Sequence, residues 1–201
     1  MPRDKTLTHA KIIQCMREEF LRYGYERSSL NRISARVGIT TAGLYKHFRN
    51  KEDMFFSLVE DTLAAFKSAA ESSISQMESG AEYDPFDSDW AGFWVDFIFR
   101  HYEGVKLLIC CSGGSPYESF EDDLIELEAD SNKRYAEILK SNGHLIRDVS
   151  DMQWHILATS YVHLIFEIVR HDMTYDEAAV HLRFVGDLLY PGWKRIYGLD
   201  N

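Results

Sequence analysis

Residues 40–48 read Thr-Thr-Ala-Gly-Leu-Tyr-Lys-His-Phe, and this stretch indicates the fold of the first part of the chain. Its first threonine is a good N-cap, because a threonine hydroxyl can accept a hydrogen bond from a free backbone N–H at a helix start. Leu44 and Phe48 lie four residues apart and give the predicted short helix one apolar face. The other face carries hydroxyl, phenol, ammonium and imidazole groups without a carboxylate. That chemistry suits a surface that meets phosphates.

A second short helix is predicted directly upstream, over residues 30–37, with Leu30, Ile33 and Val37 on its inward face. Gly38 falls in the turn between the two helices. Two short helices joined by a turn of about three to four residues that contains glycine are typical of a helix-turn-helix. An earlier helix is predicted to begin near Thr8, so the first part of the chain is expected to hold three helices.

Charge is distributed unevenly along the 201 residues, whose formal net charge is −10. Residues 1–51 contain 11 Lys and Arg against 4 Asp and Glu, which leaves +7. The remaining residues contain 11 against 28, which leaves −17, and the two parts sum to −10. A basic segment on an acidic body indicates nucleic-acid binding by the basic part.

The rest of the chain has helical spacing and no strand-like alternation of apolar residues. A long helix is predicted from Asn50 to about Met77, and a loop over residues 80–89. Further helices are expected at 90–102, 105–111, 119–141, 151–169 and 175–190, and Pro191-Gly192 is expected to interrupt the last of them. The sequence therefore predicts an all-α protein with an N-terminal three-helix helix-turn-helix domain at 1–51 and a C-terminal helical ligand-binding and dimerisation domain at 52–201.

The stretch from Ser29 to Phe56 resembles the N-terminal motif of TetR-family transcriptional regulators. In that family a capping hydroxyl precedes an apolar-x-x-Ile-Ala helix, followed by Gly-Val-Ser, Leu-Tyr-x-His-Phe and Ser-Lys-Glu. Here the matching residues are Ser29-Leu30, Ile33-Ser34, Gly38-Ile39-Thr40, Leu44-Tyr45-Lys46-His47-Phe48 and Asn50-Lys51-Glu52. The chain departs from the pattern at Ser34 and Val37, where alanine is usual, and at Gly43, which costs about 1 kcal/mol of helix propensity relative to alanine.

The resemblance implies a set of residues that contact double-stranded operator DNA. Those at the start of the second helix are expected nearest the base edges, namely Thr40, Thr41 and Gly43. The others are expected to contact phosphates or bases, namely Ser28, Ser29, Tyr45, Lys46, His47 and Lys51. Two alternatives remain open, that Tyr45 belongs partly to the core and that His47 only covers the hydrophobic layer.

A single helix-turn-helix reads few bases, so the resemblance also implies a homodimer on a palindromic operator. The last two helices are apolar over more than one face, and two copies of them are expected to form a four-helix bundle. The interface candidates are Ile156, Leu164, Ile168, Leu182, Val185 and Leu189. The alternative is that these side chains are buried within one subunit.

Aromatic residues gather in the second part of the chain and are expected to line a cavity for a small-molecule effector of unknown identity, because ligand pockets are mostly apolar. The candidates are Trp90, Phe93, Trp94, Phe97, Tyr117, Phe120, Trp154 and Tyr161. The alternative is that they fill a helical core. The function expected is a repressor that the effector releases from DNA; regulation by a protein partner and a helical enzyme are the other hypotheses.

Other kinds of site find little support in the sequence. Three cysteines are too few for a disulfide framework. His163 and Glu167 lie four residues apart and are read as an internal pair rather than as zinc ligands. The segment 112–115 lacks the lysine of a phosphate loop. No catalytic residue, metal, cofactor, membrane span or signal peptide is expected, and the expected location is the cytoplasm.

Overall fold

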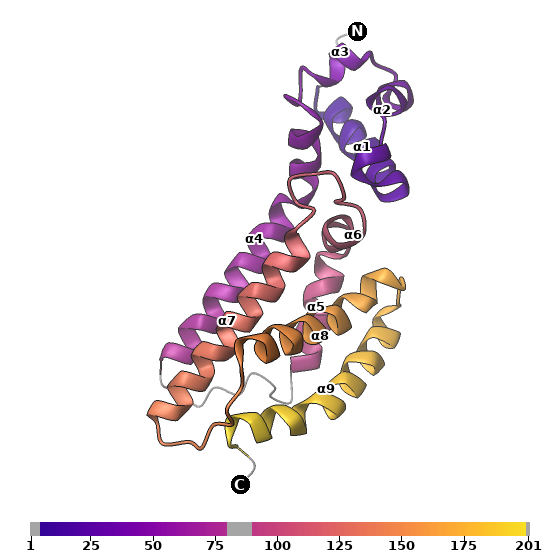
Figure 1. Cartoon of the computed structure of the whole chain (residues 1–201). Coiled ribbons are helices and arrows are strands. Elements are labelled where there is room, and N and C mark those ends of the chain that lie inside the picture. Colours follow the sequence, from indigo (N-terminus) through magenta and orange to yellow (C-terminus); the bar gives the residue numbers. More distant parts are fainter. Residues whose placement is uncertain (1–4, 80–89, 200–201) are drawn as a thin grey trace. The chain divides into compact units, whose positions relative to one another are not determined.

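The computed structural model of the chain describes residues 5–79 and 90–199 (Figure 1). Within these residues no strand occurs, and the all-α class predicted from the sequence is confirmed. The helices are α1 (Lys5–Arg27), α2 (Leu30–Val37), α3 (Thr41–Leu44), α4 (Lys51–Glu78), α5 (Trp90–Arg100), α6 (Tyr102–Cys110), α7 (Phe120–Ser141), α8 (Asp151–Arg170) and α9 (Tyr175–Tyr197).

The chain forms two compact units. The first, called unit 1, comprises residues 1–65 and 102–119, and the second, called unit 2, comprises residues 66–101 and 120–201. The helix α4 therefore supplies its first residues to unit 1 and its last to unit 2. These units are defined by internal contacts, and the functional boundary after residue 51 stays a prediction.

Unit 1 is built around the buried face of α1. Ile12, Met16 and Phe20 recur every four residues and have no exposed surface. Phe20 meets Phe55 of α4 edge to face, with ring centroids 5.3 Å apart. Gly24 has φ 72° and ψ 169°, outside the helical region, so the regular part of α1 ends at this residue.

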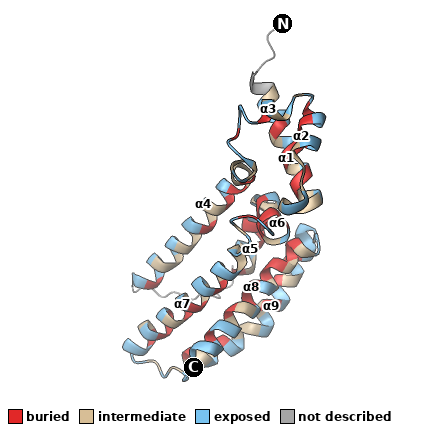
Figure 2. Ribbon diagram, turned by 45° about the horizontal axis from the view of Figure 1, so that its top comes forward, coloured by how far each residue is buried: buried red, intermediate tan, exposed pale blue. Residues whose placement is uncertain are grey.

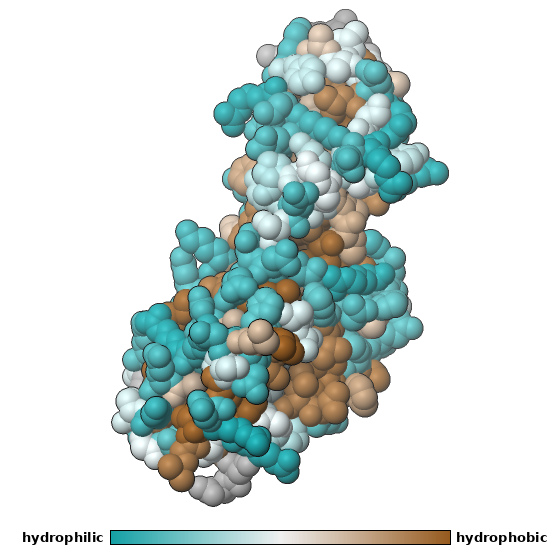
Figure 3. Space-filling model, viewed as in Figure 1, coloured by the Kyte–Doolittle hydropathy of each residue, from teal (hydrophilic) through white to brown (hydrophobic). Residues whose placement is uncertain are grey.

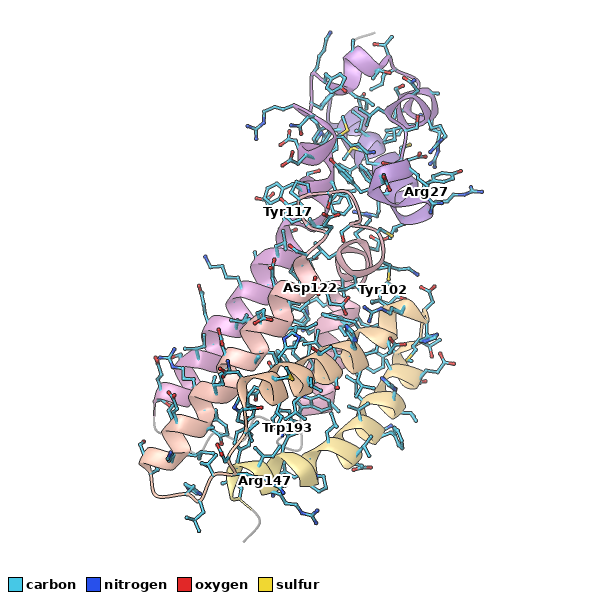
Figure 4. All side chains as sticks on the ribbon, in the orientation of Figure 1. Arg27, Tyr102, Tyr117, Asp122, Arg147 and Trp193 are labelled. Carbon is cyan, nitrogen blue, oxygen red and sulfur yellow. The ribbon has the colours of Figure 1, made fainter. Side chains whose placement is uncertain are left out.

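The helix α6 packs closely against the part of α4 that belongs to unit 1. A Cβ atom on Gly104 would overlap the hydroxyl oxygen of Thr62, which is itself buried. Glycine at this position therefore lets the two backbones approach. Beyond α6, Tyr117 lies on Phe55 and Phe56, with ring centroids 6.1 and 6.3 Å away (Figure 4).

Unit 2 is a helical bundle in which α7 packs along α8 and α5 packs along α9. Buried residues follow the inward faces of these helices (Figure 2). The prediction that Pro191 interrupts the last helix was wrong, since α9 continues to Tyr197 and ends at Gly198 in the left-handed conformation. The physical reason is tertiary packing. Trp193 of α9 is buried against α8, where its ring stacks on that of Trp154 with centroids 6.2 Å apart (Figure 4).

A membrane span is not found in the part of the chain that the structure describes, because none of its helices combines sufficient length with sufficient hydropathy.

Candidate DNA-binding surface and ligand cavity

The α2–turn–α3 segment is held by capping interactions. Ser29 caps α2 and accepts a hydrogen bond from the backbone N–H of Arg32. Gly38 ends α2 in the left-handed conformation, with φ 82° and ψ 35°. Thr40 caps α3 and accepts a hydrogen bond from the N–H of Gly43 at 3.1 Å, as the sequence indicated. The helix-turn-helix geometry is therefore encoded locally.

Regular helix α3 is shorter than predicted. It ends at Leu44, and residues 45–47 continue as turns with hydrogen bonds to carbonyls only three or four residues back. The apolar residues Leu44 and Phe48 are both buried, so the predicted inward face is present although the last turn is irregular.

The outward face of this segment carries the exposed side chains of Tyr45, Lys46 and His47. Tyr45 is 48% exposed and so lies outside the core. The ring of His47 lies 5.7 Å from that of His9 on α1. The structure thus brings a phenol, an ammonium and an imidazole together on one surface.

Besides Thr40, whose hydroxyl caps α3, four of the predicted DNA contacts use their hydrogen-bonding groups inside unit 1. Ser28 donates its hydroxyl to the carbonyl of Tyr25 at 2.7 Å. Ser29 uses its hydroxyl as a cap and donates its N–H to Glu19 at 2.9 Å. Thr41 donates its hydroxyl to the Asn31 side chain at 2.9 Å.

Lys51 is the fourth. Its ammonium donates to the carbonyls of Glu26 and Ser28 at 3.1 and 3.2 Å and lies 4.7 Å from the centre of the Tyr25 ring. Burial lowers the pKa of Lys51 from its usual value. This lysine ties the end of α1 to the start of α4, whereas the ammonium of Lys46 is exposed and forms no ion pair or hydrogen bond with any described residue.

A buried carboxylate fixes the orientation of α2 within unit 1. Glu19 is only 1% exposed, and its Oε1 lies 2.6 Å from Nη2 of Arg32 and accepts the Ser29 N–H. Lys11 donates to the carbonyl of Val37 at the other end of α2, at 3.0 Å. These contacts hold the two-helix segment on α1.

Unit 2 contains a partly open cavity of about 410 Å³ lined by α4, α5, α7 and α8. Its walls include four of the predicted aromatic residues, namely Trp90, Phe93, Trp94 and Tyr161. The hydroxyl of Tyr161 accepts hydrogen bonds from the indole N–H groups of Trp90 at 2.7 Å and Trp94 at 3.2 Å. These bonds hold α5 and α8 together at the aromatic wall.

The other four predicted pocket residues do not line this cavity. Phe97 and Phe120 pack on the ring of Phe66, with centroids 4.7 and 5.3 Å away. Trp154 stacks on Trp193. Tyr117 belongs to unit 1. Phe97 and Trp154 are buried in the core, as the alternative had it, whereas Phe120 and Tyr117 are partly exposed.

Sequence reasoning missed the walls that α4 and α7 contribute. On α7 the lining residues Leu124, Glu128, Ser131 and Tyr135 recur at spacings of three and four. Glu128 therefore lies on the same face of α7 as Leu124 and Tyr135, and an acidic residue at helical spacing from these apolar residues was the signal available in the sequence. On α4 the corresponding residues are Phe66, Ala69, Ala70, Ser72, Ser73, Gln76 and Met77.

The proposed dimer residues divide into two groups. Ile168, Leu182 and Val185 are buried inside the subunit, so they are not available to a partner, and Leu164 and Leu189 are partly exposed. An exposed apolar stripe instead contains Ile156 from the prediction together with other large side chains on α8 and α9, and apolar surface is visible over this part of the molecule (Figure 3). The additional residues are Met152, Val180, Phe184 and Leu188.

The residues weighed as metal or thiol chemistry have ordinary partners. The prediction that His163 and Glu167 pair with each other was wrong: His163 lies 3.5 Å from a Glu121 oxygen on α7, and Glu167 pairs with His171 at 2.8 Å. Burial raises the pKa of the Cys111 thiol to about 11. Among the described residues no group of His, Cys, Asp and Glu has the arrangement of a metal site.

Comparison with known proteins gives matches along the chain. The model of the tetR family of bacterial regulatory proteins matches residues 12–58. The HTH-type transcriptional repressor Rv1474c of Mycobacterium tuberculosis is 34% identical over 53 residues, which are 26% of this chain and 28% of that protein. The HTH-type transcriptional repressor AcnR of Corynebacterium diphtheriae is 24% identical over 155 residues, covering 77% of this chain and 75% of that one.

Solved structures resemble the chain over most of its length. The transcriptional regulator FadR of Bacillus subtilis in complex with stearoyl-CoA has a TM-score of 0.57 at 15% identity and covers 92% of this chain and 98% of its own. At this identity the likeness concerns the fold, and it extends through both units.

Proposed function

Since the chain belongs to the tetR family of bacterial regulatory proteins, we propose that it is a transcriptional repressor that binds palindromic operator DNA as a homodimer and leaves it when a small molecule occupies the cavity of unit 2. The observation that carries this proposal is the capped α2–turn–α3 segment, which presents Tyr45, Lys46 and His47 to solvent. Lys46 and the exposed phenol suit phosphate contacts, which set the register of a protein on DNA.

Base contacts are assigned to the start of α3. Thr40 is exposed and Gly43 has no side chain, so the backbone there can approach a base edge. The hydroxyls of Ser28 and Thr41 are engaged within unit 1, which makes them supports of the segment in this proposal rather than its main phosphate donors. Lys51 has the same supporting role.

Dimer formation is assigned to the exposed apolar stripe on α8 and α9. Val180, Phe184 and Leu188 recur every four residues on α9 and are 61, 66 and 62% exposed. Burial of such a stripe against its copy is favourable, at about 25 cal/mol for each Å² of apolar surface removed from water. Two helices from each subunit then form the interface.

Regulation by a ligand is supported by the cavity and by its connection to the helix-turn-helix through α4. This helix begins at Lys51 and reaches the cavity wall at Phe66 to Met77. We propose that ligand occupancy favours a conformation in which the two α3 segments of the dimer do not match successive major grooves. A relative of this fold is described with stearoyl-CoA bound, which supports ligand binding in a body of this architecture.

The test is selection of DNA by the full chain from a random duplex library. The expected result is a sequence with two-fold symmetry and half-sites separated by about 34–36 Å or a multiple of it. Recovery of no enriched duplex at low salt, or of a single unpaired half-site bound by a monomer, contradicts the proposal.

A further inference from the structure

Glu128 stands out among the residues that line the cavity. It is the one Asp, Glu, Lys, Arg or His side chain among the described lining residues. Its carboxylate accepts a hydrogen bond from Asn132 at 3.0 Å, and no described cation forms an ion pair with it. The protein around the cavity desolvates this group and raises its pKa. Glu128 is partly exposed to the cavity, so a cationic ligand meets there a partly desolvated carboxylate that has no competing counter-ion among the described residues.

The rest of the cavity wall suits a lipophilic cation. The rings of Trp90, Phe93, Trp94 and Tyr161 line the same space as Glu128. An aromatic face attracts a cation within about 6 Å, and tryptophan does so most strongly. The indole N–H groups of Trp90 and Trp94 already donate to Tyr161, so these side chains offer a ligand their rings rather than their donors.

The same wall is unfavourable for an anion. None of its described residues is basic. Asn132 uses one of its two amide N–H groups on Glu128, and its oxygen accepts from the Tyr197 hydroxyl at 2.7 Å. The part of the chain after residue 51 carries 11 basic against 28 acidic residues, a surplus that attracts cations.

We propose that the cavity of unit 2 binds lipophilic organic cations, with Glu128 as the counter-charge and the aromatic rings of α5 and α8 as cation–π partners. This rests on the proposed function, because it names the chemical class of the effector. The cavity of about 410 Å³ lies within the range of about 300–1,000 Å³ that is usual for small-ligand sites. The bound cation forms an ion pair with the Glu128 carboxylate, and no covalent bond is made or broken.

Two probes of nearly equal shape and opposite charge test the proposal. Tetraphenylphosphonium is a permanent cation and tetraphenylborate is an anion. Binding of each to the full chain, without DNA, is measured by calorimetry and by quenching of tryptophan fluorescence, since Trp90 and Trp94 line the cavity. Stearoyl-CoA is titrated as a third probe, because a structural relative is described with it.

The variants are Glu128→Gln, which keeps the shape and an acceptor for Asn132, and Glu137→Gln as control. Glu137 is an exposed glutamate on the same helix and does not line the cavity. The expected result is that the phosphonium binds the wild type at least tenfold more tightly than the borate does. Glu128→Gln weakens phosphonium binding by about tenfold or more, because it removes one partner of a desolvated charge pair. Glu137→Gln leaves the affinity unchanged.

Three results would overturn the proposal: equal or tighter binding of the borate or of stearoyl-CoA to the wild type, equal phosphonium affinity of the two variants, or no phosphonium binding at all. Each of these leaves DNA selection by the chain unaffected. Conversely, phosphonium binding that depends on Glu128 in a chain that selects no DNA would refute the proposed function and leave this inference standing.

Discussion

Lys46 and Lys51 carry the same charge five residues apart, but their surroundings differ. Lys46 is exposed and has no described partner, whereas Lys51 donates to the carbonyls of Glu26 and Ser28. A lysine without protein partners can neutralise a phosphate and release counterions. A lysine bound to carbonyls stabilises the fold, because its loss leaves two acceptors without their donor.

We therefore predict that Lys46→Ala lowers the slope of log K against log salt concentration by about 0.9 for each phosphate contact removed. Its free energy of unfolding should stay within about 0.5 kcal/mol of wild type. Lys51→Ala should lower that free energy by about 1–3 kcal/mol. Fluorescence anisotropy over a salt series and urea denaturation measure the two quantities. An unchanged salt slope for Lys46→Ala would exclude the phosphate contact.

Glu128 illustrates a residue whose function opposes stability. Desolvation raises the pKa of Glu128 above the ordinary 4.5. At pH values between 4.5 and this raised pKa, the folded state therefore binds more protons than the unfolded state. Stability therefore falls as pH rises through this window and stays lower above it. The cavity walls on α4, α5, α7 and α8 add no other carboxylate, lysine, arginine or histidine among the described residues.

The prediction is that Glu128→Gln raises Tm relative to wild type at pH 8 and that this gain shrinks towards pH 5. The amide cannot ionise, so the variant avoids the cost of a desolvated charge while it keeps the Asn132 hydrogen bond. Thermal unfolding at several pH values measures the effect, with Glu137→Gln as the matched exposed control. A gain that grows as pH falls would have the wrong sign and would refute the desolvated state of Glu128.

Among the elements of unit 1, α6 and α4 meet where Gly104 lies against the Thr62 side chain. Alanine at Gly104 would place its Cβ on the Thr62 hydroxyl, and Thr62 is buried, so the contact cannot be relieved by turning the side chain into solvent. We predict that Gly104→Ala lowers the free energy of unfolding by about 1–3 kcal/mol through overpacking.

Urea denaturation gives this value, and Gly113→Ala is the matched control. Gly113 has open space around its Cβ position and no positive φ. The control variant should lie within about 0.5 kcal/mol of wild type. A Gly104→Ala protein as stable as Gly113→Ala would show that α6 and α4 separate without cost.

Helices and their caps are the features that the sequence predicts well. Spacings of three and four residues indicated the helices, and the cap Thr40 was predicted from local chemistry that the structure confirms. The predicted break at Pro191 was wrong because only the local effect of proline on a helix was considered. The burial of Trp193 and Tyr197 against Trp154 overrides the local cost of a proline within a helix.

The candidate site was predictable where it depends on local sequence and less so where it depends on packing. Tyr45 and Lys46 were identified because their neighbours Leu44 and Phe48 define the opposite face. Aromatic composition alone did not separate Trp94, which lines the cavity, from Phe97, which fills the core. Which face of α5 turns towards α4 and α7 depends on contacts between distant segments.

For the whole molecule, the exposed stripe on α8 and α9 determines assembly in the proposed function. We predict that Phe184→Glu converts the dimer to a monomer, because it places a charge at the centre of an apolar stripe that includes Val180 and Leu188. Sedimentation measures the mass. The control is Leu145→Glu, which makes the same change at an exposed residue outside these helices. A dimeric Phe184→Glu protein would place the interface elsewhere.

Ligand and operator must also affect each other equally. If tetraphenylphosphonium binds the cavity and favours the conformation that releases DNA, it weakens operator affinity by a factor, and by thermodynamic linkage the operator weakens phosphonium affinity by the same factor. We expect a factor of about 5–150, the usual range for coupled sites. The helix α4 is the physical connection, because its residues occur both beside the helix-turn-helix and in the cavity wall.

The measurement is a closed cycle: operator affinity with and without saturating phosphonium, and phosphonium affinity with and without saturating operator, all at one salt concentration because DNA affinity depends on salt. In Glu128→Gln the cation binds more weakly, so more of it is needed for the same release. A salt effect of the cation on DNA would instead be the same in both proteins. Equal release at equal phosphonium concentration in wild type and Glu128→Gln would therefore show that the cavity does not mediate the coupling.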